Sequence, residues 1–114
     1  MDEEFYILLE KLRESGKPVI VEGKKDRTAL LLFGITNIFT LDRPLFAIVE
    51  DVSAKSKEAA ILTDLDKKGK FLYGKLKPDL LNHGVQIDDD FRNFLFRNTK
   101  IRQIEALKNY AEQV

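Results

Sequence analysis

Short apolar runs recur along this chain, and the first of them, at residues 18–21, shows none of the polar and apolar alternation of a strand with one face in water. They cover about residues 18–21, 35–41, 59–63 and 85–87. A run without alternation is typical of a strand that is buried on both faces, as in a parallel sheet. Helical stretches separate the runs, and parallel neighbours need such crossover connections. The pattern therefore predicts an α/β, Rossmann-like fold with a mainly parallel four-stranded sheet flanked by helices.

Helical spacing of apolar residues indicates where the connecting helices lie. Glycines follow several of these stretches and suit the left-handed end of a helix. Pro78 is expected to kink or restart the fourth helix, because proline cannot donate the backbone hydrogen bond of a helix interior. The expected helices cover about residues 2–15, 26–34, 44–53, 69–84 and 99–112.

The length of 114 residues, 44% of them hydrophobic, fits one domain. We expect residues 1–114 to form a single domain with its core at about 17–90, an N-terminal helix at 2–15 and a C-terminal helix at 99–112. Nineteen Lys and Arg balance nineteen Asp and Glu, so the net charge is zero and any site for a polyanion must be local.

Three absences narrow the class of protein further. Without cysteine, a thiolate zinc site and a cysteine nucleophile are excluded. The acidic start MDEEF is unlike a secretory signal, and no apolar run reaches the roughly 18 residues of a membrane span. We therefore expect a cytoplasmic protein with no membrane partner.

Two of the expected strands end in acid. Glu22 follows the first strand directly, and Asp64 and Asp66 follow the third. In open parallel sheets, ligands bind beyond the carboxyl ends of the strands, at the point where the strand order reverses. If the strands, numbered along the chain, lie in the order 2-1-3-4, the first and third are neighbours about 4.8 Å apart. Glu22 is then expected to face Asp64 and Asp66.

Carboxylates brought this close repel one another, by several kcal/mol for a pair about 4 Å apart at the effective dielectric of a protein surface. Either one acid takes up a proton or a divalent cation lies between them. Hard oxygen ligands without cysteine or clustered histidine favour Mg²⁺, for which Mn²⁺ can substitute. Because Mg²⁺ usually shares its coordination shell with substrate phosphate, the pattern indicates phosphoryl transfer.

Glycine and lysine follow both acidic strand ends. Gly23 and Gly69 would let the backbone come close to a ligand. Lysines in the same two loops could contact phosphate oxygens, and we predict this role for Lys24 and Lys68. For the remaining loop lysines, a solvated surface is the simpler interpretation.

The segment VIVEGKKD at 19–26, followed by ILTDLDKKGK at 61–70, resembles the Toprim domain shared by topoisomerases, bacterial-type primases and small ribosomal-RNA-maturing nucleases. The match covers about residues 17–90, and the chain is most similar to small stand-alone Toprim proteins. The resemblance implies that Glu22 is a general acid/base or a metal-linked carboxylate and that Asp64 and Asp66 are Mg²⁺ ligands. Asp26 falls where primase-like members carry a further acid, so it is expected to join the metal site, to cap the following helix, or both.

The resemblance further implies Mg²⁺-dependent chemistry on nucleic-acid phosphodiester bonds, with a nuclease acting on RNA rather than DNA as the leading hypothesis. The tyrosines lie in helical stretches with no surrounding motif, which argues against the strand passage of topoisomerases. One competing hypothesis is a non-catalytic, metal-dependent module that binds nucleic acid or nucleotide within a larger complex. The other is primase-like nucleotidyl transfer.

Other charged and aromatic residues near the C-terminus have two interpretations each. Asp88–Asp90 could form a second metal cluster, but a solvated turn is favoured. The aromatic segment 91–96 could stack on bases, but aromatic residues at this density beside a sheet more often belong to a core or an interface. Arg97, Lys100 and Arg102 could extend a phosphate track or be solvated helix charges.

Overall fold

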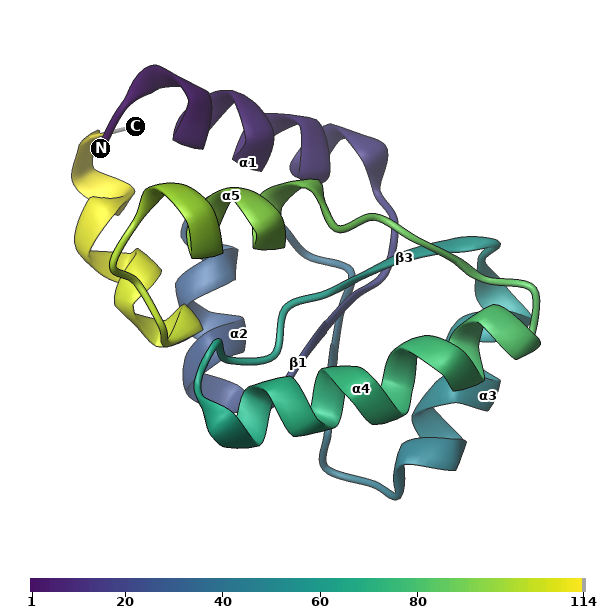
Figure 1. Ribbon diagram of the computed structural model, residues 1–114. Coiled ribbons are helices and arrows are strands. Elements are labelled where there is room, and N and C mark those ends of the chain that lie inside the picture. Colours follow the sequence, from purple (N-terminus) through teal and green to yellow (C-terminus); the bar gives the residue numbers. More distant parts are fainter. Residues whose placement is uncertain (114) are drawn as a thin grey trace.

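The predicted strands pair as one parallel sheet in the computed structural model, which describes residues 1–113 (Figure 1). Their order is β2-β1-β3-β4, and β1 pairs in parallel with both β2 and β3. The predicted fold class is therefore confirmed, and the strand order is the one under which Glu22 was expected to face Asp64 and Asp66. The strands are β1 (Val19–Val21), β2 (Ile38–Thr40), β3 (Glu58–Ile61) and β4 (Gln86–Ile87).

Helices cover both faces of the sheet, with α1 and α5 above the strands and α3 and α4 below them in Figure 1. No helix among residues 1–113 is long and apolar enough to cross a membrane. The bounds are α1 (Glu3–Ser15), α2 (Lys24–Leu31), α3 (Leu45–Lys55), α4 (Lys67–Asn82), α5 (Asp90–Asn98) and the 3-10 helix η1 (Ile104–Gln113).

The side chains of strand β1 show why helices must pack on both faces of the sheet. Val19 and Val21 are fully buried in one core, which α1, α5 and η1 complete. Ile20 is fully buried in the opposite core, formed with α3 and α4. Successive side chains of a strand point to opposite faces. A run of apolar residues without alternation is therefore stable only between two apolar layers.

The C-terminal half differs most from the sequence-based expectations. Helix α4 continues through Pro78 instead of restarting there, with Leu76 and Leu80 buried on either side of it. Residues 90–98 form a helix, α5, that was not predicted as one. The predicted closing helix at 99–112 is wrong at its start, because residues 99–103 are not helical and η1 begins at Ile104. The start of η1 is fixed by a tertiary contact, the hydrogen bond that Ile104 N donates to Asp64 Oδ1.

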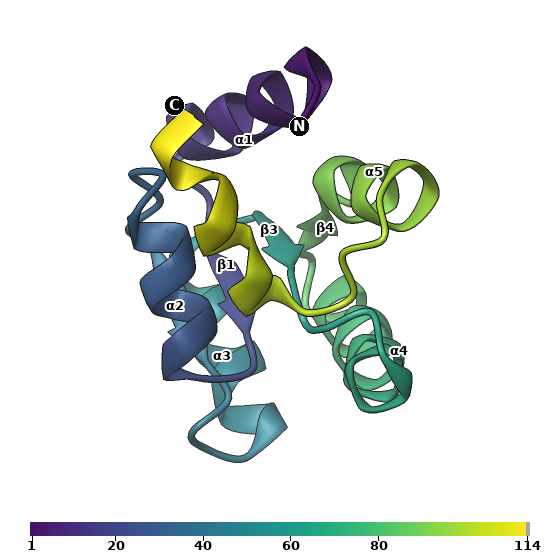
Figure 2. The same ribbon diagram turned by 90° about the vertical axis from the view of Figure 1, so that its left-hand side faces the viewer.

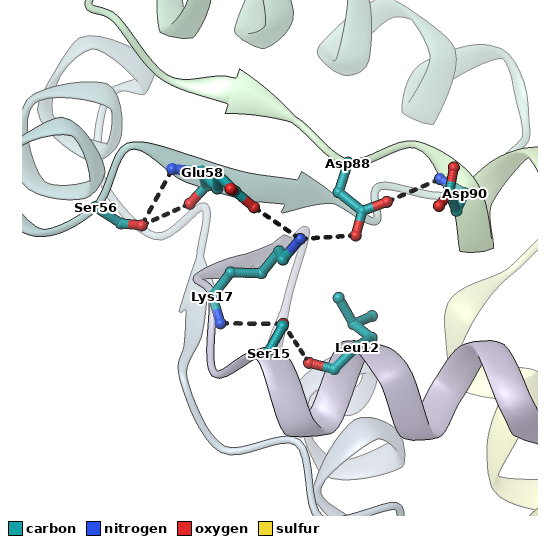
Figure 3. A network of polar contacts seen from close by, with 7 residues as sticks. All are labelled: Leu12, Ser15, Lys17, Ser56, Glu58, Asp88 and Asp90. Carbon is teal, nitrogen blue, oxygen red and sulfur yellow. Dashed lines mark hydrogen bonds and ion pairs between the residues drawn. The ribbon is translucent and has the colours of Figure 1, made fainter.

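The acids at 88–90 serve the fold. Figure 3 shows the Lys17 ammonium group between Asp88 Oδ2, at 2.9 Å, and Glu58 Oε2, at 3.1 Å. This ion pair ties the chain before β1 to β3 and to the end of β4. Asp89 accepts hydrogen bonds from Tyr73 and Lys77 of α4, each at 2.7 Å. Within residues 1–113, these acids belong to no group of carboxylates spaced to hold a metal ion.

Candidate metal centre

The three acids predicted to converge do so at the carboxyl edge of the sheet. Glu22 follows β1 directly, and Asp64 and Asp66 lie in the connection between β3 and α4. One carboxylate oxygen from each lies within 4.8 Å of the other two. Glu22 and Asp64 are half-buried and Asp66 is exposed, so the group opens to solvent on the Asp66 side.

Each of the three carboxylates is oriented by a backbone N–H on one of its oxygens. Glu22 Oε2 accepts from Asp64 N at 2.7 Å, and Asp64 Oδ1 accepts from Ile104 N at 2.8 Å. Asp66 Oδ1 accepts from Gly69 N at 2.8 Å and so caps α4. Among the described residues, the second oxygen of each carboxylate makes no hydrogen bond and is available to a ligand.

The size of this group fits a small divalent cation. Adjacent oxygens of an octahedral site lie about 3 Å apart and opposite ones about 4 Å apart when the metal–oxygen distance is about 2.1 Å. The three oxygens lie within 4.8 Å of one another, which is close to this range. The donor set consists of carboxylate oxygens alone, which hard cations prefer. This acidic triad could therefore bind a metal ion.

The electrostatics of the triad also favour a bound cation. The pKa of Asp64 is raised above its usual value, mainly by burial, with a further rise from the negative charge of Asp66. The hydrogen bond from Ile104 N–H and the charge of Arg92 act in the opposite direction but do not cancel the rise. The fold thus holds a carboxylate whose charged form is disfavoured, and a cation would relieve this.

Asp26 lies beside the triad but outside it. Gly23, not Asp26, is the N-cap of α2, and Asp26 occupies the third helical position. Its Oδ2 accepts from Gly23 N at 3.1 Å, so it stabilises the start of the helix from within. Asp26 is only 8% exposed, and burial, followed by the charge of Asp64, raises its pKa to about 6. Metal binding by Asp26 stays a prediction.

Sequence reasoning missed Arg92, a buried residue of α5 that supports the loop carrying the acids. Its guanidinium donates to the carbonyl oxygens of Thr63 and Asp64 and lies 4.6 Å from the centre of the Tyr73 ring. Burial is the main cause that lowers the pKa of Arg92. The helical spacing of Phe91, Arg92 and Leu95 could have placed this arginine on the buried face, had residues 90–98 been recognised as a helix.

The two loop glycines differ in what they do. A Cβ atom on Gly69 would lie 1.8 Å from the carbonyl oxygen of Asp64, so the close packing of the loop on itself accounts for this glycine. Thr63 Oγ1 donates to Gly69 O at 2.7 Å and holds the same contact. A Cβ atom on Gly23 would meet nothing within 4 Å, so space beside its backbone is open. Phosphate binding by either glycine stays a prediction.

The lysines of the two loops carry positive charge to this edge. Lys24 and Lys68 are exposed, and neither forms an ion pair among the described residues. Their ammonium groups are therefore free to meet an anion from solvent. Contact with phosphate by these two residues stays a prediction.

Comparison with known proteins gives relatives along nearly the whole chain. No protein-family model matches. The UPF0292 protein of Methanocaldococcus jannaschii is 32% identical, over 98% of this chain and 95% of the relative. The UPF0292 protein of Pyrococcus abyssi is 38% identical, over 92% of this chain and 82% of the relative.

Two solved structures resemble the fold described here. A protein from Aquifex aeolicus has a TM-score of 0.82 and 30% identity, over 92% of this chain and 97% of that one. The Aquifex aeolicus primase, in a crystal structure of its zinc-binding and RNA polymerase domains, has a TM-score of 0.54 and 26% identity. That match covers 92% of this chain but only 27% of the primase chain.

Proposed function

The chain belongs to the UPF0292 family, and we propose that it is a Toprim protein with Mg²⁺-dependent activity on nucleic-acid phosphodiester bonds, cleaving RNA in preference to DNA. The observation that carries the proposal is the meeting of Glu22, Asp64 and Asp66 within 4.8 Å at the carboxyl edge of a parallel sheet. The structural similarity to a primase, which covers 92% of this chain, supports nucleic-acid chemistry at this edge.

Asp64 and Asp66 are proposed to hold the Mg²⁺ ion through the oxygens that the backbone leaves free, with Asp26 as a further ligand nearby. When bound, Mg²⁺ supplies Lewis-acid stabilisation of the negative charge that develops on the phosphate. The backbone N–H groups of Ile104 and Gly69 hold the two carboxylates in place, so little side-chain entropy remains to be lost on binding.

Glu22 is proposed as the general base. The hydrogen bond from Asp64 N–H fixes one of its oxygens, and the second oxygen can take a proton from the attacking water. Lys24 and Lys68 are proposed to balance the charge of the phosphate, and the open space beside Gly23 lets the phosphate approach the backbone.

Cleavage assays with two conservative variants test this function. Glu22→Gln and Asp64→Asn should each abolish cleavage of structured RNA in Mg²⁺ and leave the circular dichroism spectrum unchanged. Glu50→Gln, at an exposed acid of α3, is the matched control and should cleave as the wild type does. Wild-type cleavage by either site variant, or cleavage in the presence of a chelator, would reject the proposal.

A second candidate is primase-like nucleotidyl transfer, which the likeness to the Aquifex aeolicus primase favours. It predicts incorporation of labelled nucleotides into oligomers in Mg²⁺. A third candidate, the non-catalytic binding module, predicts metal-dependent binding of RNA with neither cleavage nor incorporation. The same purified protein, incubated with RNA, with DNA and with free nucleotides, separates the three.

A further inference from the structure

An exposed aromatic residue near the end of α5 lies against two cations from separate parts of the chain. Phe96, near the end of α5, is 47% exposed. The Lys70 ammonium of α4 lies 5.0 Å from its ring centroid, and the Arg102 guanidinium carbon lies 5.2 Å from it. Since two cations already lie against this ring, its role is to position positive charge rather than to offer a free surface to a base.

No acid neutralises these two cations. Lys70 and Arg102 form no ion pair with a carboxylate within residues 1–113, and neither does Lys100, two residues before Arg102. In contrast, Lys17, Lys77 and Lys108 each pair with an acid. In a chain of zero net charge, this leaves a local positive surface beside the acidic triad. Such a surface attracts phosphate groups.

A pocket of about 610 Å³ adjoins this cluster through Arg102 and the triad through Asp66. Asp66 and residues 98–103 belong to its lining, and Lys70 and Phe96 lie outside it. The volume is within the range of small-molecule sites. The side-chain amides of Asn98 and Gln103 make no hydrogen bond among the described residues, so both can donate to and accept from a ligand.

We propose that this pocket is a nucleotide subsite for single-stranded nucleic acid, adjoining the metal centre through Asp66. The nucleoside next to the reacting phosphate lies in the pocket, where Asn98 and Gln103 meet the edge of its base. The following phosphate lies on Lys70 and Arg102. Because a base must leave its stack to enter a pocket, the subsite selects unpaired strands over duplexes. This inference deepens the proposed function and rests on it.

Helix α4 offers a matched control for this subsite. Lys75 and Phe71 form a second lysine–aromatic pair on the same helix, with 5.5 Å between the ammonium group and the ring centroid. At about 100° per residue, Lys75 projects about 140° around the helix from Lys70. Neither pair lines the pocket itself, but Lys70 shares the Phe96 ring with Arg102, which does line it, whereas Lys75 and Phe71 have no such link.

The test is fluorescence anisotropy with a labelled single-stranded oligoribonucleotide, in chelator so that no cleavage occurs, over a series of salt concentrations. Lys70→Gln should weaken binding about fivefold near 0.1 M salt and reduce the slope of log K against log salt by about 0.7, the value for one lost phosphate contact on a single strand. Phe96→Leu should weaken binding with an unchanged slope, because Lys70 remains but loses the ring that holds it, whereas backbone carbonyl oxygens still hold Arg102. Lys75→Gln and Phe71→Leu should change neither quantity.

The proposal of a subsite would be overturned if Lys70→Gln and Lys75→Gln changed RNA binding equally. It would also be overturned if duplex RNA bound as tightly as the single strand, or if the wild type did not bind RNA. The Asp64→Asn variant distinguishes the subsite from the proposed function. It should no longer cleave RNA, but its binding should keep the part of the salt slope that depends on Lys70. Cleavage that survives in Lys70→Gln with unchanged binding would reject the subsite and leave the nuclease proposal intact.

Discussion

At the scale of single residues, the fold brings acidic groups close together and partly buries them. Asp26 and Asp64 both have pKa values raised mainly by burial. An unfolded chain ionises aspartate at a pKa of about 3.9. Each of these side chains therefore binds its proton more tightly in the folded protein than in the unfolded one. At neutral pH, this difference lowers the free energy of unfolding of the metal-free protein.

The stability of the metal-free protein should therefore fall as pH rises. Between about pH 4 and 6, folded Asp26 keeps a proton that the unfolded chain has released, so stability declines over this window and stays lower above it. Asp26→Asn should raise the free energy of unfolding at pH 7.5 by about 2 kcal/mol and make the decline shallower. The amide oxygen can still accept from Gly23 N–H. Urea titrations in chelator at pH 4.5 and 7.5 measure both effects, and a destabilised variant at pH 7.5 would contradict the assignment.

The buried positive charge of Arg92 supports the loop that carries Asp64. Arg92→Met should lower the free energy of unfolding by about 2 kcal/mol or more, because the carbonyl oxygens of Thr63 and Asp64 lose a charged donor. Arg97→Met, at an exposed arginine of the same helix, should change stability little. Equal urea midpoints for the two variants would show that Arg92 does not hold the loop.

At the scale of elements, the join between β3 and α4 forms the site, and α4 begins within it. Asp66 is both the N-cap of α4 and a member of the triad. The helix contains a tightly packed glycine at its start, Gly69, and an open one further on, Gly74. The two positions should respond to the same substitution in opposite directions.

Gly69→Ala should displace the loop, because its Cβ would lie 1.8 Å from Asp64 O, and should both destabilise the protein and weaken metal binding. Gly74→Ala meets nothing within 4 Å and should stabilise the helix by up to about 1 kcal/mol. Thermal unfolding with and without Mn²⁺ measures both. A Gly69→Ala protein with unchanged stability and unchanged metal response would refute this account of the loop.

The sequence predicted those elements whose signals are local. The strands followed from short apolar runs, and the acids at the ends of the first and third strands had to meet once these strands were neighbours. The start of η1 had no such signal, since it depends on Ile104 N–H reaching Asp64 across the fold. Helix α5 was missed because Asp88–Asp90 suggested a solvated turn, whereas Asp88 and Asp89, just before the helix, pair with Lys17 and Lys77. Arg92 belongs to this helix and was therefore not predicted either.

At the scale of the whole molecule, the C-terminal segment closes over the carboxyl edge of the sheet. Figure 2 shows η1 beside α2, with its far end near α1. Tyr6 of α1 donates to the carbonyl oxygen of Tyr110 at 3.3 Å, and the ring of Phe5 lies 5.7 Å from that of Tyr110. The two ends of the described chain thus support each other, and the Ile104 N–H that orients Asp64 belongs to this closing segment. Folding and assembly of the acidic site are therefore coupled.

Electron paramagnetic resonance of added Mn²⁺ reports whether the acidic triad binds a metal ion. We expect saturable binding by the wild type, displaced by Mg²⁺ and lost in Asp64→Asn. Asp90→Asn, at an exposed acid outside the triad, should bind as the wild type does. Absence of binding by the wild type, or equal binding by Asp64→Asn, would contradict the claim that Asp64 and Asp66 hold a metal ion.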